Sequence, residues 1–389
     1  MVRALGVDPG TRSFDLVVVE GPRVVWEKSI DTVEVAQNPQ KLLKAIEEAS
    51  PVDIVAGPSG YGTPVLCNED IVDVKRFALE ILLLSTERDI EEGLSRGELG
   101  IAVYSALARV VEALWRSGLK VCYLPSVILL PTVPVHRKLN RVDMGTADKL
   151  AVTALAIYDQ SRRLGIGYEE TSFILVELGF GYNAVIAVDR GKVVDGYGGT
   201  LMPMGFLTIG PIDAEIVAAG RSWSRSDVFY GGVASICNEL DPVKALEKSL
   251  SDDLCRAAFQ SMFEAVEKAV RSSLLAVPKP REIILSGRLT RIPQIFEELS
   301  KRLEKIAPVV RVRGLEGARV AKEAAQGMAL IGEGLAGGYF RDLVEHLEIT
   351  KARGTTLSWV YHPRAVEVRK RLEYVCREVV VRKELCSPL

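Results

Sequence analysis

Residues 6–11 read Gly-Val-Asp-Pro-Gly-Thr, and residues 176–181 read Val-Glu-Leu-Gly-Phe-Gly. In each stretch an apolar run typical of a buried strand ends at a carboxylate, Asp8 or Glu177, and a glycine follows two residues later. A second apolar strand, a glycine-containing hairpin turn and a third strand come next in both places. The two stretches therefore predict the same unit, a three-stranded meander with a glycine turn after its first strand.

The likeness between the two halves continues downstream. The apolar run and small-residue turn of residues 52–60 are matched by residues 281–290, and the small-residue helical pattern of residues 144–151 is matched by residues 316–325. Three matches in the same order indicate a duplicated α/β architecture. We expect an N-terminal lobe at 1–165, a C-terminal lobe at 166–338 and a charged extension at 339–389.

Composition narrows the classes of function. At 389 residues, 48% hydrophobic and 26% charged, the chain predicts a globular protein of two or three lobes with a cleft between them. Its 49 basic and 51 acidic residues nearly cancel, which argues against nucleic acid or a membrane surface as a partner. The apolar runs are too short to span a membrane, and the six cysteines form no C-x-x-C pair. We expect a cytoplasmic protein with buried, reduced thiols.

The glycine turns suggest phosphate chemistry. Without a side chain at Gly10 or Gly179, backbone amides can converge on an anion, and Asp8 and Glu177 could hold Mg²⁺ beside it. No G-x-x-x-x-G-K-[ST] sequence occurs, and the second turn leads into a strand rather than a helix, so a P-loop and a dinucleotide fingerprint are both excluded. Two phosphate turns and a metal fit ATP with Mg²⁺.

These motifs resemble those of the actin, Hsp70 and sugar kinase superfamily, whose duplicated ribonuclease H-like fold binds ATP in a central cleft. Residues 6–11 and 176–181 resemble its two phosphate motifs, residues 283–290 its adenosine motif, and residues 145–154 and 317–330 its two connecting helices. Within the superfamily the chain is most similar to an archaeal family labelled predicted butyrate kinase. The resemblance implies metal ligands at Asp8 and Glu177 and a set of nucleotide-binding residues: Gly10, Thr11, Arg12, Gly179, Gly181, Ser286, Gly287 and Arg288.

The acceptor end of the site is less well defined. Asp148 lies in a segment that resembles the Gly-Ala-Asp-Arg motif of type III pantothenate kinases, which implies a catalytic base, but it could equally stabilise the first turn of its helix. Asp143 competes with it as the base or as the helix cap. Nearby, Arg137 and Arg141 could bind a substrate carboxylate or be solvated surface. Residues 196–205 could line an acyl pocket or pack against a neighbouring subunit in a homodimer.

The sequence thus favours a Mg-ATP-dependent small-molecule kinase, with a short-chain carboxylate such as butyrate or acetate among the candidate acceptors. None of the three histidines, His136, His346 and His362, lies in the glycine-flanked setting of acetate and butyrate kinases, which weakens the case for a carboxylate. The alternative is a nucleotide-gated binding or regulatory protein of the actin or Hsp70 type. Acceptor-dependent release of ADP would separate the two.

Overall fold

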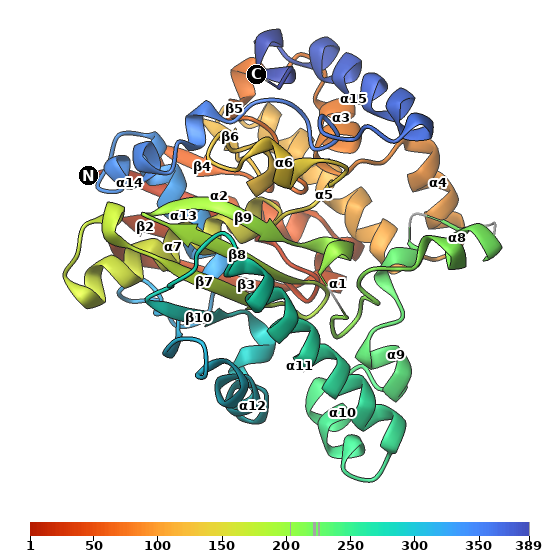
Figure 1. Ribbon diagram of the computed structural model, residues 1–389. Helices are drawn as coiled ribbons and strands as arrows, with labels where there is room; N and C mark the ends of the chain where they lie inside the picture. Colours follow the sequence, from red (N-terminus) through yellow and green to blue (C-terminus); the bar gives the residue numbers. More distant parts are fainter. Residues whose placement is uncertain (203, 221–222, 225, 389) are drawn as a thin grey trace.

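The computed structural model describes residues 1–389 except 203, 221–222, 225 and 389, and it contains two sheets flanked and separated by helices (Figure 1). The first sheet has the strand order β3-β2-β1-β4-β6-β5. The second has the order β11-β10-β7-β8-β9. The strands of the first sheet are β1 (Arg3–Pro9), β2 (Ser13–Glu20), β3 (Arg23–Asp31), β4 (Ile54–Ala56), β5 (Leu66–Cys67) and β6 (Val121–Tyr123). Those of the second are β7 (Phe173–Leu178), β8 (Asn183–Asp189), β9 (Lys192–Tyr197), β10 (Glu282–Ser286) and β11 (Val309–Arg311).

Helices form three layers around these sheets. The first group in the chain is α1 (Thr32–Gln37), α2 (Gln40–Ala49), α3 (Val74–Arg76), α4 (Glu87–Ser95), α5 (Leu99–Arg116), α6 (Val135–Lys138) and α7 (Ala147–Leu164). The second is α8 (Ala214–Gly220), α9 (Val233–Cys237), α10 (Pro242–Ser249), α11 (Asp253–Ser273), α12 (Pro293–Leu303) and α13 (Glu323–Leu335). The C-terminal part adds α14 (Arg341–His346) and α15 (Val366–Val379).

The two sheets share one topology, which confirms the expected duplication. Strands β1, β2, β3, β4 and β6 correspond in order and direction to β7, β8, β9, β10 and β11. Even an irregularity is repeated, because the register of β2 with β3 shifts between Val18 and Val19 and that of β8 with β9 shifts between Ala187 and Val188. Strand β5 is an antiparallel addition at the edge of the first sheet. This is the two-lobed, actin-like fold that the sequence predicts.

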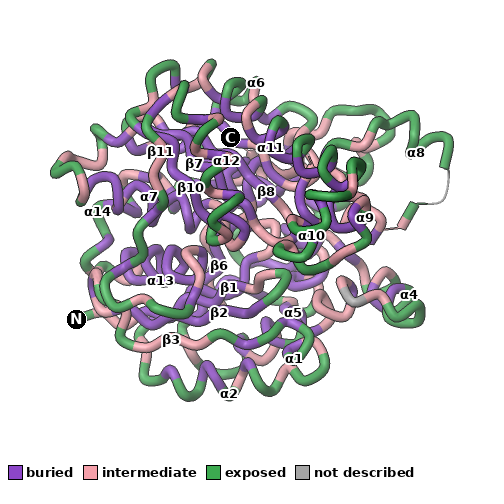
Figure 2. The backbone as a smooth tube through the Cα atoms, turned by 90° about the horizontal axis from the view of Figure 1, so that it is seen from below, coloured by how far each residue is buried: buried purple, intermediate pink, exposed green. Residues whose placement is uncertain are grey.

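Helices α7 and α13 pack against each other between the sheets, where they share a core with residues of both (Figure 2). Small residues permit this approach, as the sequence indicated. A Cβ added to Gly327 of α13 would lie 2.0 Å from the carbonyl oxygen of Ala151 in α7, and one added to Gly6 of β1 would lie 2.3 Å from the Ala325 oxygen. Because α13 also lies on β1, β2 and β4, the last helix of the second half covers the sheet of the first.

The outer faces carry two further cores. Helices α2, α5 and α15 contribute to the core outside the first sheet, and α9 to α12 cover the second. The charged extension therefore packs on the N-terminal half, through Leu372, Val375 and Val379 of α15. None of the helices in the described ranges combines the length and the apolar character needed to cross a bilayer. The domain boundaries at 165 and 338 stay a prediction.

The expectation of reduced thiols is wrong. All six cysteines lie among the described residues and are paired, as Cys67–Cys122, Cys237–Cys255 and Cys376–Cys386. The sequence separations of 55, 18 and 10 residues give no local signal for this pairing. Tertiary contact creates it, as in the first pair, whose members face each other in neighbouring strands β5 and β6.

Candidate active site

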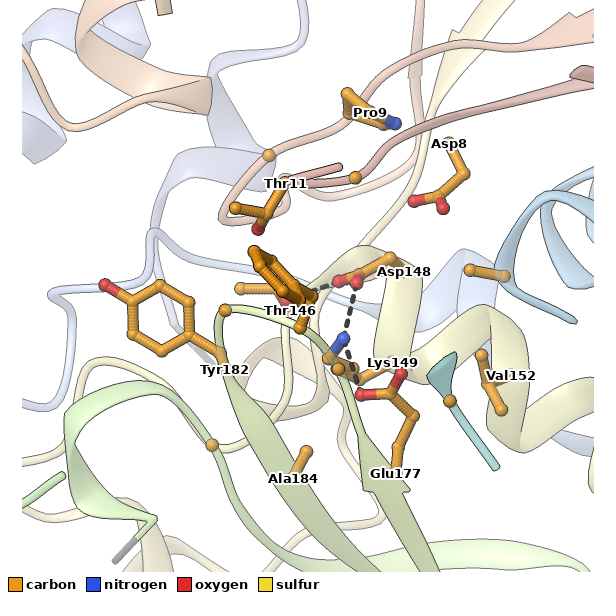
Figure 3. Close-up of a pocket in the computed structure, with 18 of the residues that line it drawn as sticks. Asp8, Pro9, Thr11, Thr146, Asp148, Lys149, Val152, Glu177, Tyr182 and Ala184 are labelled. Carbon is orange, nitrogen blue, oxygen red and sulfur yellow. Dashed lines mark hydrogen bonds and ion pairs between the residues drawn. The ribbon is translucent and has the colours of Figure 1, made fainter. Parts of the chain in front are cut away.

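A cavity of about 220 Å³ lies where β1 and β7, the first strands of the two sheets, end (Figure 3). Its wall combines the turn after β1, the turn after β7, the start of α7 and the start of α13. The wall contains most of the residues that the sequence singled out: Asp8, Gly10, Thr11, Arg12, Asp143, Asp148, Glu177, Gly179, Gly181, Gly287 and Arg288. Residues 170 positions apart in the chain therefore share one cavity because the two halves face each other.

The two glycine turns touch across the cavity. A Cβ on Gly181 would lie 2.7 Å from the hydroxyl oxygen of Thr11, so the absence of a side chain there lets the turns meet. Gly179 has a different reason to be glycine, since its Cβ would lie 2.5 Å from the Tyr182 oxygen in its own hairpin. Arg12 lies over the ring of Phe180, 5.5 Å from the centroid, and adds a contact between the halves.

Asp8 is held by a lysine from the other half of the chain. The ammonium of Lys322, the residue that caps α13, lies 2.9 Å from Asp8 Oδ2 and 3.1 Å from Asp15 Oδ2. Burial raises the pKa of Asp8, and the lysine opposes that shift. Burial acts to lower the pKa of Lys322, but the carboxylates of Asp8 and Asp15 outweigh it and raise the value. The lysine is therefore charged at neutral pH.

Glu177 is held in the same manner by a lysine from the first half. Lys149 Nζ lies 2.7 Å from Glu177 Oε2 and 2.9 Å from Asp148 Oδ2 (Figure 3). Burial raises the pKa of Glu177 against the opposing effect of Lys149. For Asp148 burial also acts upward, but Lys149 and the hydrogen bond from the Thr146 hydroxyl outweigh it and lower the pKa. Asp148 is therefore an ionised, firmly oriented carboxylate.

Asp143 has a different environment. Its Oδ1 accepts a hydrogen bond of 2.7 Å from the Gly145 amide, and burial raises its pKa to about 6. Gly198 and Gly199 pack on its carboxylate, because a Cβ on either would lie 2.5 Å from one of its oxygens. The segment 196–205, apart from 203, which lies outside the described residues, thus contributes its glycines to this cavity. Asp143 and Asp148 form a pair whose environments move their pKa values in opposite directions.

The turn after β10 completes the wall. Gly287 has φ +91°, a conformation that favours glycine, and its Cβ would lie 2.4 Å from the Leu178 oxygen. Arg288 donates a hydrogen bond of 3.0 Å to the hydroxyl of Ser13, which lies in the other half. Ser286 is buried beneath the turn and is not part of the cavity wall.

The expected substrate arginines lie elsewhere. Arg137 donates a hydrogen bond of 2.7 Å to the Val194 oxygen, and Arg141 lies 5.2 Å from the centroid of the Tyr197 ring. Both arginines pack on β9 and neither is among the residues that line the cavity. The structure gives them no contact with the remaining candidate residues.

The chain belongs to the family described as protein of unknown function DUF1464. The family profile matches residues 6–362. A search of curated proteins gives no match. Among solved structures, an acetate kinase from Porphyromonas gingivalis shares the fold with a TM-score of 0.56 and 13% identity, over 86% of this chain and 100% of that one. A propionate kinase from Francisella tularensis subsp. tularensis SCHU S4 aligns with a TM-score of 0.54 and 13% identity, over 85% and 98% of the two chains.

At these identities the comparison establishes the fold alone. It confirms the superfamily architecture that the sequence predicted. The likeness to the family labelled predicted butyrate kinase stays a prediction.

Sequence reasoning missed the two lysines of the cavity. A signal existed, because Lys149 directly follows Asp148 and Lys322 lies in the second of the two matched helical segments. It also missed the tyrosines of the wall, Tyr61, Tyr104 and Tyr182. Tyr104 and Tyr182, from opposite halves, both meet the ring of Phe229 edge-on at about 6 Å.

The donor set fits a magnesium ion that arrives with a nucleotide. No group of three or more His, Cys, Asp or Glu side chains suited to a metal occurs in the described part of the chain. Mg²⁺ in nucleotide sites usually takes one or two protein carboxylates and completes its shell with phosphate oxygens and water. Asp8 and Glu177 supply two carboxylates on one wall, each already beside a cation.

Proposed function

We propose that this protein is a Mg-ATP-dependent small-molecule kinase that transfers a phosphoryl group in the cleft between its two halves. One observation carries the proposal: a single cavity unites both glycine turns, both strand-end carboxylates and a pair of aspartates with opposite pKa shifts. Phosphoryl transfer requires little covalent chemistry from the protein. It requires cations around the phosphates, an aligned acceptor and a group that positions or deprotonates that acceptor.

The phosphates would lie between the two glycine turns. Among the described residues, the amides of Thr11 and Arg12 donate no hydrogen bond to a backbone carbonyl, which leaves them for an anion. The side chains of Arg12 and Arg288 border the same space and would offset phosphate charge. The nucleoside would lie toward Gly287 and the start of α13. A bound magnesium ion, held through Asp8 and Glu177, would neutralise charge that develops on the transferred group.

The cavity supports a hydroxyl acceptor better than a carboxylate. A carboxylic acid is already ionised at neutral pH, needs no base, and would meet repulsion from Asp143 and Asp148. The two arginines that could have bound it do not line the cavity. An alcohol, in contrast, must lose a proton as it attacks. The names of the acetate and propionate kinases that share the fold point to carboxylates, so both acceptor classes belong in the test.

Asp143 is the better placed of the two aspartates to accept that proton. A general base works best when its pKa lies near the operating pH, and the pKa of Asp143 is about 6. Asp148, ionised and bound to Lys149 and Thr146, would orient the site. In the transfer step the acceptor oxygen bonds to the γ-phosphorus, the bond from that phosphorus to the oxygen leaving with ADP breaks, and the acceptor proton moves to an Asp143 oxygen.

Coupled detection of ADP with a panel of short alcohols, polyols and carboxylates tests the proposal. We expect release of ADP to depend on an alcohol acceptor, and Asp143→Asn to abolish that dependence while ATP binding persists. Arg137→Ala serves as the matched control, because its side chain lies outside the cavity, and should retain turnover. Slow hydrolysis of ATP that no acceptor stimulates would instead identify a nucleotide-gated protein of the actin or Hsp70 type.

A further inference from the structure

The two connecting helices exchange lysines between the halves of the molecule. Lys149, at the start of α7, neutralises Glu177 at the end of β7, and Lys322, at the start of α13, neutralises Asp8 at the end of β1. Each strand-end carboxylate is thus paired with a cation from the opposite half. The arrangement repeats with the pseudo-symmetry of the duplicated fold, although the two lysines are not at equivalent helix positions.

Both pairs lie on the cavity wall rather than in the interior of a lobe. The side chains of Lys149 and Lys322 are 13% and 15% exposed, and both line the cavity between the glycine turns. They stand beside the carboxylates that would bind magnesium. An ammonium and a divalent cation repel each other strongly in a poorly solvated site, so one carboxylate oxygen cannot serve both at once.

The starts of α7 and α13 also direct the lysines toward the space between the turns. Helix N-termini favour anions, and an ammonium there gains a stronger partner when a phosphate enters. A phosphate oxygen and a carboxylate are both good partners for a lysine, so the exchange leaves no charge unpaired.

We propose that Lys149 and Lys322 change partners when a nucleotide binds: each leaves its carboxylate for a phosphate oxygen and so makes that carboxylate available to the metal. Divalent metal then binds only after, or together with, the nucleotide. The proposal rests on the nucleotide site of the proposed function but not on phosphoryl transfer. It assigns the lysines to nucleotide binding and makes metal affinity conditional on the nucleotide.

The first test measures binding of ATP and of adenosine by calorimetry, with EDTA present. Lys322→Met and Lys149→Met should each weaken ATP binding about 10- to 100-fold and leave adenosine binding unchanged. Asp8→Asn should have the opposite effect and strengthen ATP binding, because it removes a negative charge beside the phosphates and frees Lys322. The control is Lys192→Met, which removes a half-buried ion pair with Glu348 outside the cavity and should bind ATP like the wild type.

The sign reversal protects the test against misfolding. If Lys322→Met fails to fold because Asp8 and Asp15 lose their cation, Asp8→Asn still decides the question, since Lys322 keeps Asp15 as a partner. Equal ATP affinity in wild type and in the folded lysine variants, or weaker binding in Asp8→Asn, would overturn the exchange.

The second test uses Mn²⁺ alone, followed by electron paramagnetic resonance. The wild type should bind Mn²⁺ weakly without nucleotide and at least tenfold more tightly with ADP, whereas Lys322→Met should bind it without nucleotide. Tight Mn²⁺ binding by the nucleotide-free wild type would contradict the proposal. If the wild type binds no nucleotide, the proposed function and this inference fall together. If the binding results hold but no acceptor is phosphorylated, the kinase proposal falls and the exchange stands.

Discussion

Replacement of Asp143 by asparagine should stabilise the protein at neutral pH. Burial raises the pKa of this carboxyl from its ordinary value of 3.8 to about 6. Each pKa unit corresponds to about 1.4 kcal/mol, so keeping the group ionised destabilises the folded state by at most about 3 kcal/mol. The figure is an upper value because the side chain borders the cavity and keeps some access to water. Asparagine has nearly the same shape and can still accept the Gly145 amide.

The gain should depend on pH with a definite sign. A carboxyl whose pKa is raised on folding contributes stability that is fully present below the unfolded value of 3.8 and is lost as the pH rises through about 6. Asparagine does not titrate. The advantage of the variant should therefore be small near pH 4, grow by up to about 2 kcal/mol between pH 4.5 and pH 7.5, and change little above pH 7.5.

Scanning calorimetry of wild type and Asp143→Asn across that pH range provides the measurement. Asp252→Asn is a control with the opposite sign. The Asp252 carboxylate accepts the amides of Cys255 and Leu254 at the start of α11, which lowers its pKa, so its removal should destabilise the protein more at pH 7.5 than at pH 4.5. A Tm of Asp143→Asn at or below wild type at pH 7.5, or a difference that does not vary with pH, would refute the reasoning.

Three further predictions concern activity, packing and the disulfides. Acceptor-dependent turnover should fall about tenfold per pH unit below pH 6, as Asp143 takes up a proton, and a kcat/KM profile that stays flat down to pH 5 would exclude it as the base. Gly327→Ala should lower the free energy of unfolding by roughly 2 kcal/mol or more, because its Cβ would lie 2.0 Å from the Ala151 oxygen; denaturant unfolding measures this, and an unchanged midpoint would mean that the helix contact is looser than described. Replacing both Cys237 and Cys255 by alanine should destabilise the protein by about 3 kcal/mol, given the 18-residue separation of the pair, and mass spectrometry after alkylation without reductant should find both thiols of the wild type blocked.

The glycine turns could be predicted because their signal is local. A carboxylate at the end of an apolar strand and a glycine two residues later are adjacent in the sequence, and the duplication repeats them in order. The same holds for α7 and α13, whose small residues mark a close helix contact. These features indicated the fold and brought Asp8, Glu177 and their turns to one cavity.

The partners of those residues could not be read in the same way. Arg137 and Arg141 are close to Asp143 in the chain, yet they pack on β9, because chain proximity does not decide which face of a loop a side chain occupies. The cysteines are far apart in the chain and still pair.

The sequence by itself determined a duplicated α/β fold with a phosphate-type turn in each half, because strand periodicity and glycine turns depend on neighbouring residues. Only the tertiary structure decided the charge arrangement of the cavity. Lys322 lies 314 residues from Asp8 in the chain and meets it because α13 of the second half packs on the sheet of the first. Burial then separates the pKa values of Asp143 and Asp148, which are five residues apart, since desolvation and ion pairing depend on what the fold places around each carboxylate.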